Sequence, residues 1–195
     1  MVRSLVAIVL VAAAADLAGV QIPAAESVID DPEAYVVYAT LIAAEGPARR
    51  DASKQLVIQR ETVVNKDCTV SGGALETDWK AVADDFKLEN AHVRFVSPDR
   101  DLHRPYVVVP EKDLLAFFTK QGGNWPAFYR QYPDSGGYVE LSAIGFDRSK
   151  TRAMVYVAHH CGGLCGGGSY HLLEKVDAKW READVPGMTT CMWVS

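Results

Sequence analysis

The chain has 195 residues, 49% of them hydrophobic, and a formal net charge of −5 at pH 7. A chain of this length is expected to fold as one domain with a sizeable core. Its acidic balance and its dispersed Lys and Arg residues argue against a nucleic-acid partner, which would require a basic face. No segment after the N-terminus is long and apolar enough to cross a bilayer, so we expect no membrane span in the mature chain.

The N-terminus has the pattern of a secretory signal peptide. An arginine precedes the apolar stretch from Leu5 to Ala12, and Ala13-Ala14-Ala15 forms a small-residue cleavage site. An aspartate ends the apolar run well short of the roughly 20 residues that a spanning helix needs. A site after Ala25 is the less typical alternative. We therefore predict a signal peptide over residues 1–15, a single domain over 16–195, and a secreted or periplasmic mature protein.

All four cysteines follow the signal peptide. An even number in an oxidising compartment favours two disulfides, and four cysteines allow three connectivities. The pairing that we favour joins Cys161 to Cys165 across a glycine-rich loop, and Cys68 to Cys191 between the two halves of the chain. The longer of these closed loops would stabilise the fold by about 4–5 kcal/mol in the chain-entropy model.

The first part of the chain predicts mainly helices. Asp31-Pro32-Glu33 is typical of a helix start, with a capping aspartate, proline in the first turn and an acidic residue near the positive helix end. Apolar residues then recur at helical spacing until a glycine ends the run. The further expected elements are helices over 75–88, 110–121 and about 125–132, a strand over 55–64, and short strands over 93–96 and 106–109.

From Gly137 the hydrophobic period changes from 3.6 residues to 2, which is typical of strands. The expected strands are Tyr138–Phe146, Thr151–His159, Tyr170–Val176 and Lys179–Val185. Short connections predict hairpins and therefore an antiparallel meander. The sequence thus predicts an α+β fold in which N-terminal helices pack on a C-terminal antiparallel β-meander of about four strands.

The segment from His159 to His171 concentrates histidine, cysteine and glycine between two predicted strands. His159 and His171 could face each other across the hairpin, and Cys161 would project on the side of His159. Imidazole and thiolate are good zinc ligands. However, the chain lacks H-E-x-x-H and paired C-x-x-C motifs, and a disulfide would withdraw Cys161. We therefore predict no metal site and no other cofactor. If the chain did bind a metal, His159 and His171 would be the candidate ligands.

Other chemistries find less support in this loop. Gly168 stands where a phosphate-binding P-loop requires lysine. Ser169 lacks the G-x-S-x-G context of a hydrolase nucleophile. The glycines are instead expected to supply positive φ angles to a small disulfide ring. Trp125 and Tyr129 belong to an aromatic group that suits either a ligand platform or core packing, so we count them with His159 and His171 as candidate ligand-binding residues.

The last part of the chain resembles a group of uncharacterised secreted bacterial proteins. The resemblance rests on Trp125-x-x-Phe128-Tyr129-x-x-Tyr132-Pro133, Cys161-Gly162-x-Leu164-Cys165-Gly166-x-Gly168 and the terminal Trp193-Val194-Ser195. It implies a shared fold, and no activity or catalytic residue comes with it.

These features predict an extracytoplasmic binding or interaction domain, with a disulfide-braced glycine-rich hairpin loop. Its partner would be an extracytoplasmic ligand or protein of unknown identity. The alternative is a secreted hydrolase, metal-dependent or not, with a site where His159, His160 and His171 approach the aromatic residues. A structural envelope protein is the third reading. The sequence assigns no catalytic residue.

Overall fold

The computed structural model describes residues 27–44, 54–64, 70–118, 125–187, 189–190 and 192–194. The signal peptide expected over 1–15 lies outside these residues. Cys68 and Cys191 also lie outside them, so their disulfide stays a prediction.

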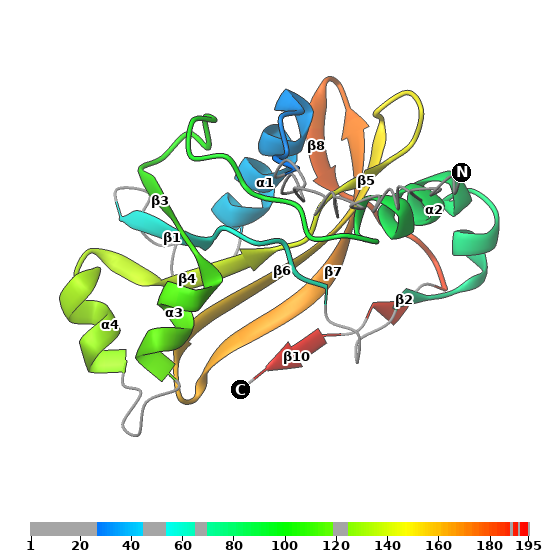
Figure 1. Cartoon of the computed structure of the whole chain (residues 1–195). Coiled ribbons are helices and arrows are strands. Elements are labelled where there is room, and N and C mark those ends of the chain that lie inside the picture. The colour runs from blue at the N-terminus through cyan, green and yellow to red at the C-terminus, as the bar shows by residue number, and fades with distance from the viewer. Residues whose placement is uncertain are drawn as a thin grey trace, which may run out of the picture.

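All helices of the described chain lie before residue 132, interspersed with three strands, and the rest of the described chain contains strands only (Figure 1). The helices are α1 (Pro32–Ala44), the 3-10 turn η2 (Gly73–Glu76), α2 (Lys80–Glu89), α3 (Glu111–Phe118) and α4 (Trp125–Gln131). The strands are β1 (Gln55–Gln59), β2 (Val70–Ser71), β3 (Tyr106–Val109), β4 (Ser135–Leu141), β5 (Gly145–Phe146), β6 (Arg152–Gly162), β7 (Cys165–Val176), β8 (Lys179–Glu182), β9 (Thr189–Thr190) and β10 (Met192–Val194).

Most strands join one 8-stranded mixed sheet with the main order β10-β7-β6-β4-β1-β3. Strand β5 pairs with β6, and β8 pairs with β7. The pairs from β10 to β4 are antiparallel, whereas β1 runs parallel to both β3 and β4. A separate two-stranded sheet joins β2 to β9.

The predicted α+β class agrees with this architecture, but its details were wrong. The sheet contains more than the four expected strands, and it is mixed rather than wholly antiparallel. Helices α3 and α4 lie between β3 and β4 in the chain, so the helices do not all precede the sheet. Strand β1 is buried along almost its whole length, because it lies between β4 and β3 in the sheet.

Both faces of the sheet are covered. On one face, which we call the α1 face, α1 packs over alternate residues of β6 such as Val155 and Val157. On the other face, α2 packs over Met154 and Tyr156 of the same strand. Helices α3 and α4 cover the same second face further along, over β1 and β4, and Figure 1 shows them at the opposite end of the sheet from α2. In the sequence, Met154 to Ala158 is apolar on both faces, which predicts a central strand covered on both sides, and the position of β6 confirms this.

Helix α1 begins as the sequence predicted. The backbone N–H of Glu33 donates to Asp31 Oδ1 at 3.0 Å, which caps the helix. The buried hydroxyl of Tyr38 then donates to the backbone oxygen of Ser142 at 2.7 Å and ties the helix to the sheet. Burial raises the pKa of Tyr38 well above its usual value, so this donor keeps its proton.

The β6–β7 hairpin corrects the expectation of a long glycine loop. Gly162 pairs with Cys165, so only Gly163 and Leu164 form the turn, and the following glycines belong to β7. No glycine from 162 to 168 has a positive φ. At Gly168 a Cβ atom would lie 2.5 Å from the Tyr156 hydroxyl and 2.6 Å from Nε1 of Trp193. The absence of a side chain there makes room for the close approach of these two rings.

The β5–β6 turn is organised by Asp147. Its Oδ1 accepts hydrogen bonds from the backbone N–H groups of Thr151 at 2.7 Å and Arg152 at 3.0 Å. Its Oδ2 accepts from the hydroxyls of Ser149 and Thr151, both at 2.8 Å. Burial raises the pKa of this carboxyl, but these hydrogen bonds outweigh it and leave the pKa below its usual value.

A depressed pKa in the folded state means that the carboxylate stabilises the fold above its unfolded pKa of about 3.9. That contribution is lost as the pH falls through the lower folded value. We expect Asp147→Asn to reduce the free energy of unfolding at pH 7 by about 1–3 kcal/mol and the difference from wild type to shrink at pH 3. Urea unfolding at both pH values measures this. Ser149→Ala removes one donor and should cost less; an equal Asp147→Asn deficit at both pH values would contradict the assignment.

Among the described helices, none has the length and apolar character needed to cross a membrane.

Candidate functional site

The hairpin end is closed by the predicted disulfide. Cys161 and Cys165 are bonded, with their Cα atoms 5.0 Å apart. The side chain of His159 lies close by: its ring nitrogen and the two sulfurs fall within 4.8 Å of one another. Leu164, at the turn, is 93% exposed. The disulfide therefore braces a short, protruding hairpin tip with an imidazole beside it.

The two candidate histidines do not face each other. The β6–β7 register places His159 opposite Gly167 and His171 opposite Val155. Four ladder positions separate them, which is about 13 Å along the strands. The expected His159–His171 pair across the hairpin was wrong, because the strand pairing continues to the tip instead of ending at these residues.

His171 instead forms a hydrogen-bonded chain with Ser169 and Glu182, neither of which is among the candidate site residues predicted from the sequence. Ser169 Oγ lies 2.9 Å from His171 Nε2, and His171 Nδ1 lies 2.6 Å from Glu182 Oε1. His171 is buried, Ser169 is partly exposed, and the Glu182 side chain is 56% exposed. The order hydroxyl, imidazole, carboxylate is that of a serine-hydrolase triad.

The chemistry of the partners fixes the histidine tautomer. An ionised carboxylate can only accept hydrogen bonds, so Nδ1 of a neutral His171 must carry the proton that Glu182 receives. Nε2 then has a lone pair and accepts from the hydroxyl of Ser169. This is the arrangement in which an imidazole can act as a general base toward a hydroxyl group.

The sheet geometry explains why these three side chains meet. Ser169 and His171 are two residues apart on β7, so both point to the α1 face. Asp177 and Ala178, both with positive φ, form the two-residue β7–β8 turn. That turn sets Glu182 opposite Leu173, one diagonal step from His171.

Exposed apolar side chains lie next to Ser169. Strand β10 pairs with β7 so that Met192 lies opposite Ser169 and Val194 opposite Gly167. Met192 is 71% and Val194 80% exposed. Since directly paired residues in a sheet point to the same face, these two side chains flank the serine on the α1 face.

The aromatic candidates occupy the other face. Trp125 and Tyr129 of α4 are partly buried and pack, with Tyr138, around the buried Phe128. The Tyr129 hydroxyl donates to the backbone oxygen of Cys161 at 2.8 Å, and burial raises the pKa of Tyr129. These rings therefore anchor the hairpin tip to α4, and their packing favours a core role over a ligand platform.

His160 also lies on this second face, apart from His159 and His171. Its ring stacks on Tyr138 at 4.6 Å between centroids and lies 5.5 Å from the Trp193 ring. Nε2 is 3.2 Å from Glu140 Oε2, an ion-pair distance for a protonated ring, although the atoms are not aligned as a hydrogen bond. The three neighbouring histidines thus do not form one cluster.

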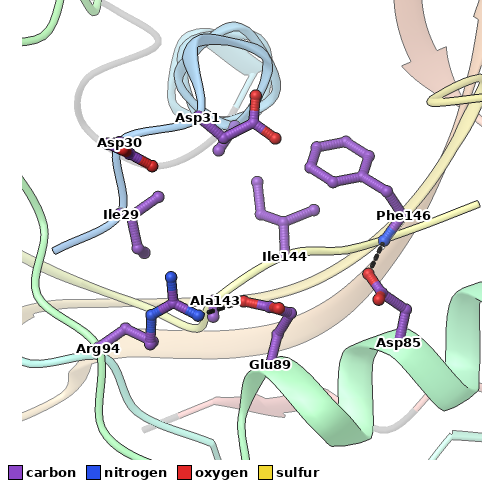
Figure 2. A pocket seen from close by; sticks show the side chains of 10 residues that line it. Ile29, Asp30, Asp31, Asp85, Glu89, Arg94, Ala143, Ile144 and Phe146 are labelled. Carbon is purple, nitrogen blue, oxygen red and sulfur yellow. Dashed lines mark hydrogen bonds and ion pairs between the residues drawn. The ribbon is translucent and has the colours of Figure 1, made fainter. Parts of the chain in front are cut away.

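A separate pocket of about 200 Å³ lies between the start of α1, α2 and β5 (Figure 2). Three of the four carboxylates that line it have structural partners. Asp85 Oδ2 accepts from the backbone N–H of Phe146 at 2.8 Å, Glu89 pairs with Arg94, and Asp31 caps α1. These three carboxylates therefore hold elements of the fold together, and they are not grouped around a reacting centre.

Sequence reasoning could have found Ser169 and Glu182. A Ser-x-His pattern inside a strand places both side chains on one face. The predicted two-residue connection at Asp177-Ala178 sets Glu182 opposite Leu173, and hence diagonal to His171. Ser169 does not stand in a G-x-S-x-G elbow, so the usual hydrolase motif does not identify it.

No family model, curated protein or solved structure matches this chain. The resemblance to uncharacterised secreted proteins therefore rests on its motif residues alone.

Proposed function

We propose that this protein is an extracytoplasmic esterase-type hydrolase with Ser169 as nucleophile, His171 as general base and Glu182 as the orienting carboxylate. The observation that carries the proposal is the continuous hydrogen-bonded chain from Ser169 Oγ through the His171 ring to Glu182. The proposed site lies on β7 and β8, on the opposite face of the sheet from the aromatic group of α4.

The residues supply each proton transfer of a two-step hydrolysis. Ser169 Oγ attacks the ester carbonyl carbon while its proton moves to His171 Nε2. Collapse of the tetrahedral intermediate expels the alcohol, which takes that proton and leaves an acyl group on Ser169. Water then attacks the acyl carbon, gives a proton to Nε2, and releases the acid as the serine oxygen recovers the proton.

The neighbouring side chains favour an ester with a short apolar acyl group. Met192 and Val194 are exposed on the same face as Ser169 and can cover such a group. Burial of His171 keeps water from competing for its ring nitrogens, whereas the side chain of the orienting residue Glu182 is 56% exposed.

A fluorophosphonate probe tests the proposal directly. An activated serine displaces fluoride and gains a phosphonyl group, which intact mass and peptide mapping locate. We expect one label per chain at Ser169, and none in Ser169→Ala. The matched control is Ser149→Ala, because the Ser149 hydroxyl donates directly to the Asp147 carboxylate at 2.8 Å, with no imidazole between the two groups. Labelling elsewhere, or no labelling of folded protein, would overturn the assignment.

A binding or interaction domain is the second candidate. The exposed apolar residues Leu164, Met192 and Val194 near the braced hairpin tip favour it. A folded protein that takes no label and hydrolyses no ester would support this reading over the hydrolase.

The extracytoplasmic location is part of the proposal and is supported by the Cys161–Cys165 disulfide together with the N-terminal pattern. We expect the mature protein to begin near Asp16 and to gain about 4 Da on reduction, two hydrogens for each of two disulfides. Intact mass before and after reduction measures both. A gain of about 2 Da would contradict the Cys68–Cys191 bond, and retention of residues 1–15 in the exported protein would contradict the signal peptide.

A further inference from the structure

The disulfide end of the β6–β7 hairpin gathers three side chains of a kind that binds soft metal ions. A ring nitrogen of His159 and the sulfurs of Cys161 and Cys165 lie within 4.8 Å of one another. In the oxidised chain the sulfurs bond to each other, and a disulfide sulfur is not a thiolate ligand. Reduction changes the same group into one imidazole and two thiols.

We propose that reduction of the Cys161–Cys165 disulfide creates a site for one thiophilic metal ion, Zn²⁺ or Cu⁺, held by His159, Cys161 and Cys165. The reductant is a dithiol, which gives two electrons and two protons to the protein sulfurs and becomes a disulfide itself. Each protein thiol then releases one proton as its thiolate binds the ion. The inference does not depend on the proposed hydrolysis.

The backbone already brings the ligands close to the required separation. Zinc–sulfur bonds of about 2.3 Å and zinc–nitrogen bonds of about 2.0–2.1 Å in a tetrahedral site put the ligand atoms roughly 3.4–3.8 Å apart. The Cα atoms of Cys161 and Cys165 are 5.0 Å apart, so rotation of the two side chains opens the sulfurs to this distance. The three ligand atoms now lie within 4.8 Å of one another, so a similar rotation of the His159 side chain brings its ring nitrogen to the required distance.

The donor set selects the class of metal. Two thiolates and an imidazole are soft ligands that favour Cu⁺ and Zn²⁺ over Mg²⁺ or Ca²⁺, which prefer oxygen. Three ligands complete a trigonal Cu⁺ site, whereas Zn²⁺ would take a fourth ligand such as water. The exposed turn at Gly163-Leu164 leaves room for that ligand, since a Cβ at Gly163 would meet nothing within 4 Å.

The neighbouring His160 provides a matched control. It follows His159 in the strand but points to the opposite face, where it stacks on Tyr138. A site built from His159 should therefore be insensitive to a change at His160, although the two residues are adjacent in sequence. Simple attraction of a metal to a histidine-rich segment would make no such distinction.

The test titrates reduced, oxygen-free protein with Zn²⁺ and with Cu⁺ against chromophoric chelators, and uses Co²⁺ to report thiolate charge-transfer absorption. We expect one equivalent in reduced wild type and none at the same concentrations in the oxidised protein. His159→Ala should weaken binding by at least about tenfold, while His160→Gln should bind as wild type does. The chelator arms show which of the two ions the site prefers.

Cys161→Ser/Cys165→Ser, measured reduced, separates this site from Cys68 and Cys191, and it should lose the bound equivalent. Retained binding in that variant would overturn the proposal, as would equal binding by oxidised wild type. His159→Ala with unchanged affinity, or His160→Gln with a greater loss than His159→Ala, would also overturn it. Thermal unfolding of each metal-free variant confirms that a loss of binding is not a loss of folding.

Discussion

Replacing Ser169 with alanine is expected to lower kcat/KM for hydrolysis of p-nitrophenyl acetate by about 10⁴-fold or more. The reason is that the variant keeps the fold but loses the proposed nucleophile, the hydroxyl oxygen that lies 2.9 Å from His171 Nε2. A change of one hydroxyl on a partly exposed residue should alter stability little. Initial rates at several substrate concentrations measure the effect, with Ser149→Ala as the control that keeps wild-type turnover.

A change at His171 tests the central residue of the same hydrogen-bonded chain. His171→Ala should cause a loss comparable to that of Ser169→Ala, and the two together should lose little more, because residues that act as a unit are not additive. His103→Ala is the matched control: His103 pairs with Asp101 at 3.1 Å and is exposed, with no serine in that pair. Since His171 is buried, its variant is compared with wild type by thermal unfolding as well.

Glu182→Gln should cause a smaller loss than either change. Its amide can still contact the ring, but the exposed position lets water replace part of the lost acceptor. Wild-type turnover in Ser169→Ala would contradict the proposed role of the serine. Turnover that is lost in His103→Ala but kept in His171→Ala would move the site to another part of the chain.

The site shows how far local patterns reach. The hairpins, the central position of β6 and the Cys161–Cys165 bond followed from period, turn residues and spacing. The function of the strand residues did not, because Ser169 and His171 match no contiguous motif. Their proposed role also depends on Glu182, which belongs to another strand. Its position beside His171 follows only from the register of β7 and β8.

The parallel pairing of β1 with β3 and β4 could not be predicted from local patterns either, for a different reason. Strand β1 pairs with β3 and β4, which follow it at a distance in the chain, and no turn signal joins them. Such non-local pairing is set by tertiary packing rather than by local sequence. The role of the glycines was predicted wrongly for the same reason. Gly168 allows Tyr156 and Trp193 to approach each other, and this contact joins residues that are far apart in the sequence.

Gly137 is the glycine whose backbone conformation matters most for the hairpin tip. Its φ is +109°, a conformation that residues with a side chain rarely adopt. A Cβ there would lie 2.0 Å from the backbone oxygen of His160 and 2.9 Å from the Cα of Cys161. Alanine would therefore have to push apart β4 and the end of β6 that carries both residues.

Gly137→Ala is expected to reduce the free energy of unfolding by about 3 kcal/mol or more, since the strained φ costs roughly 1–3 kcal/mol and the clash with rigid backbone adds a comparable amount. Urea unfolding at pH 7 measures this. Gly163→Ala is the matched control, because a Cβ there meets nothing within 4 Å, and it should stay within about 0.5 kcal/mol of wild type. Equal stability of the two variants would show that the β4–β6 contact at Gly137 does not constrain the fold. A deficit confined to Gly137→Ala, by contrast, would mean that the position of His160 and Cys161 is set from β4 as well as by the disulfide.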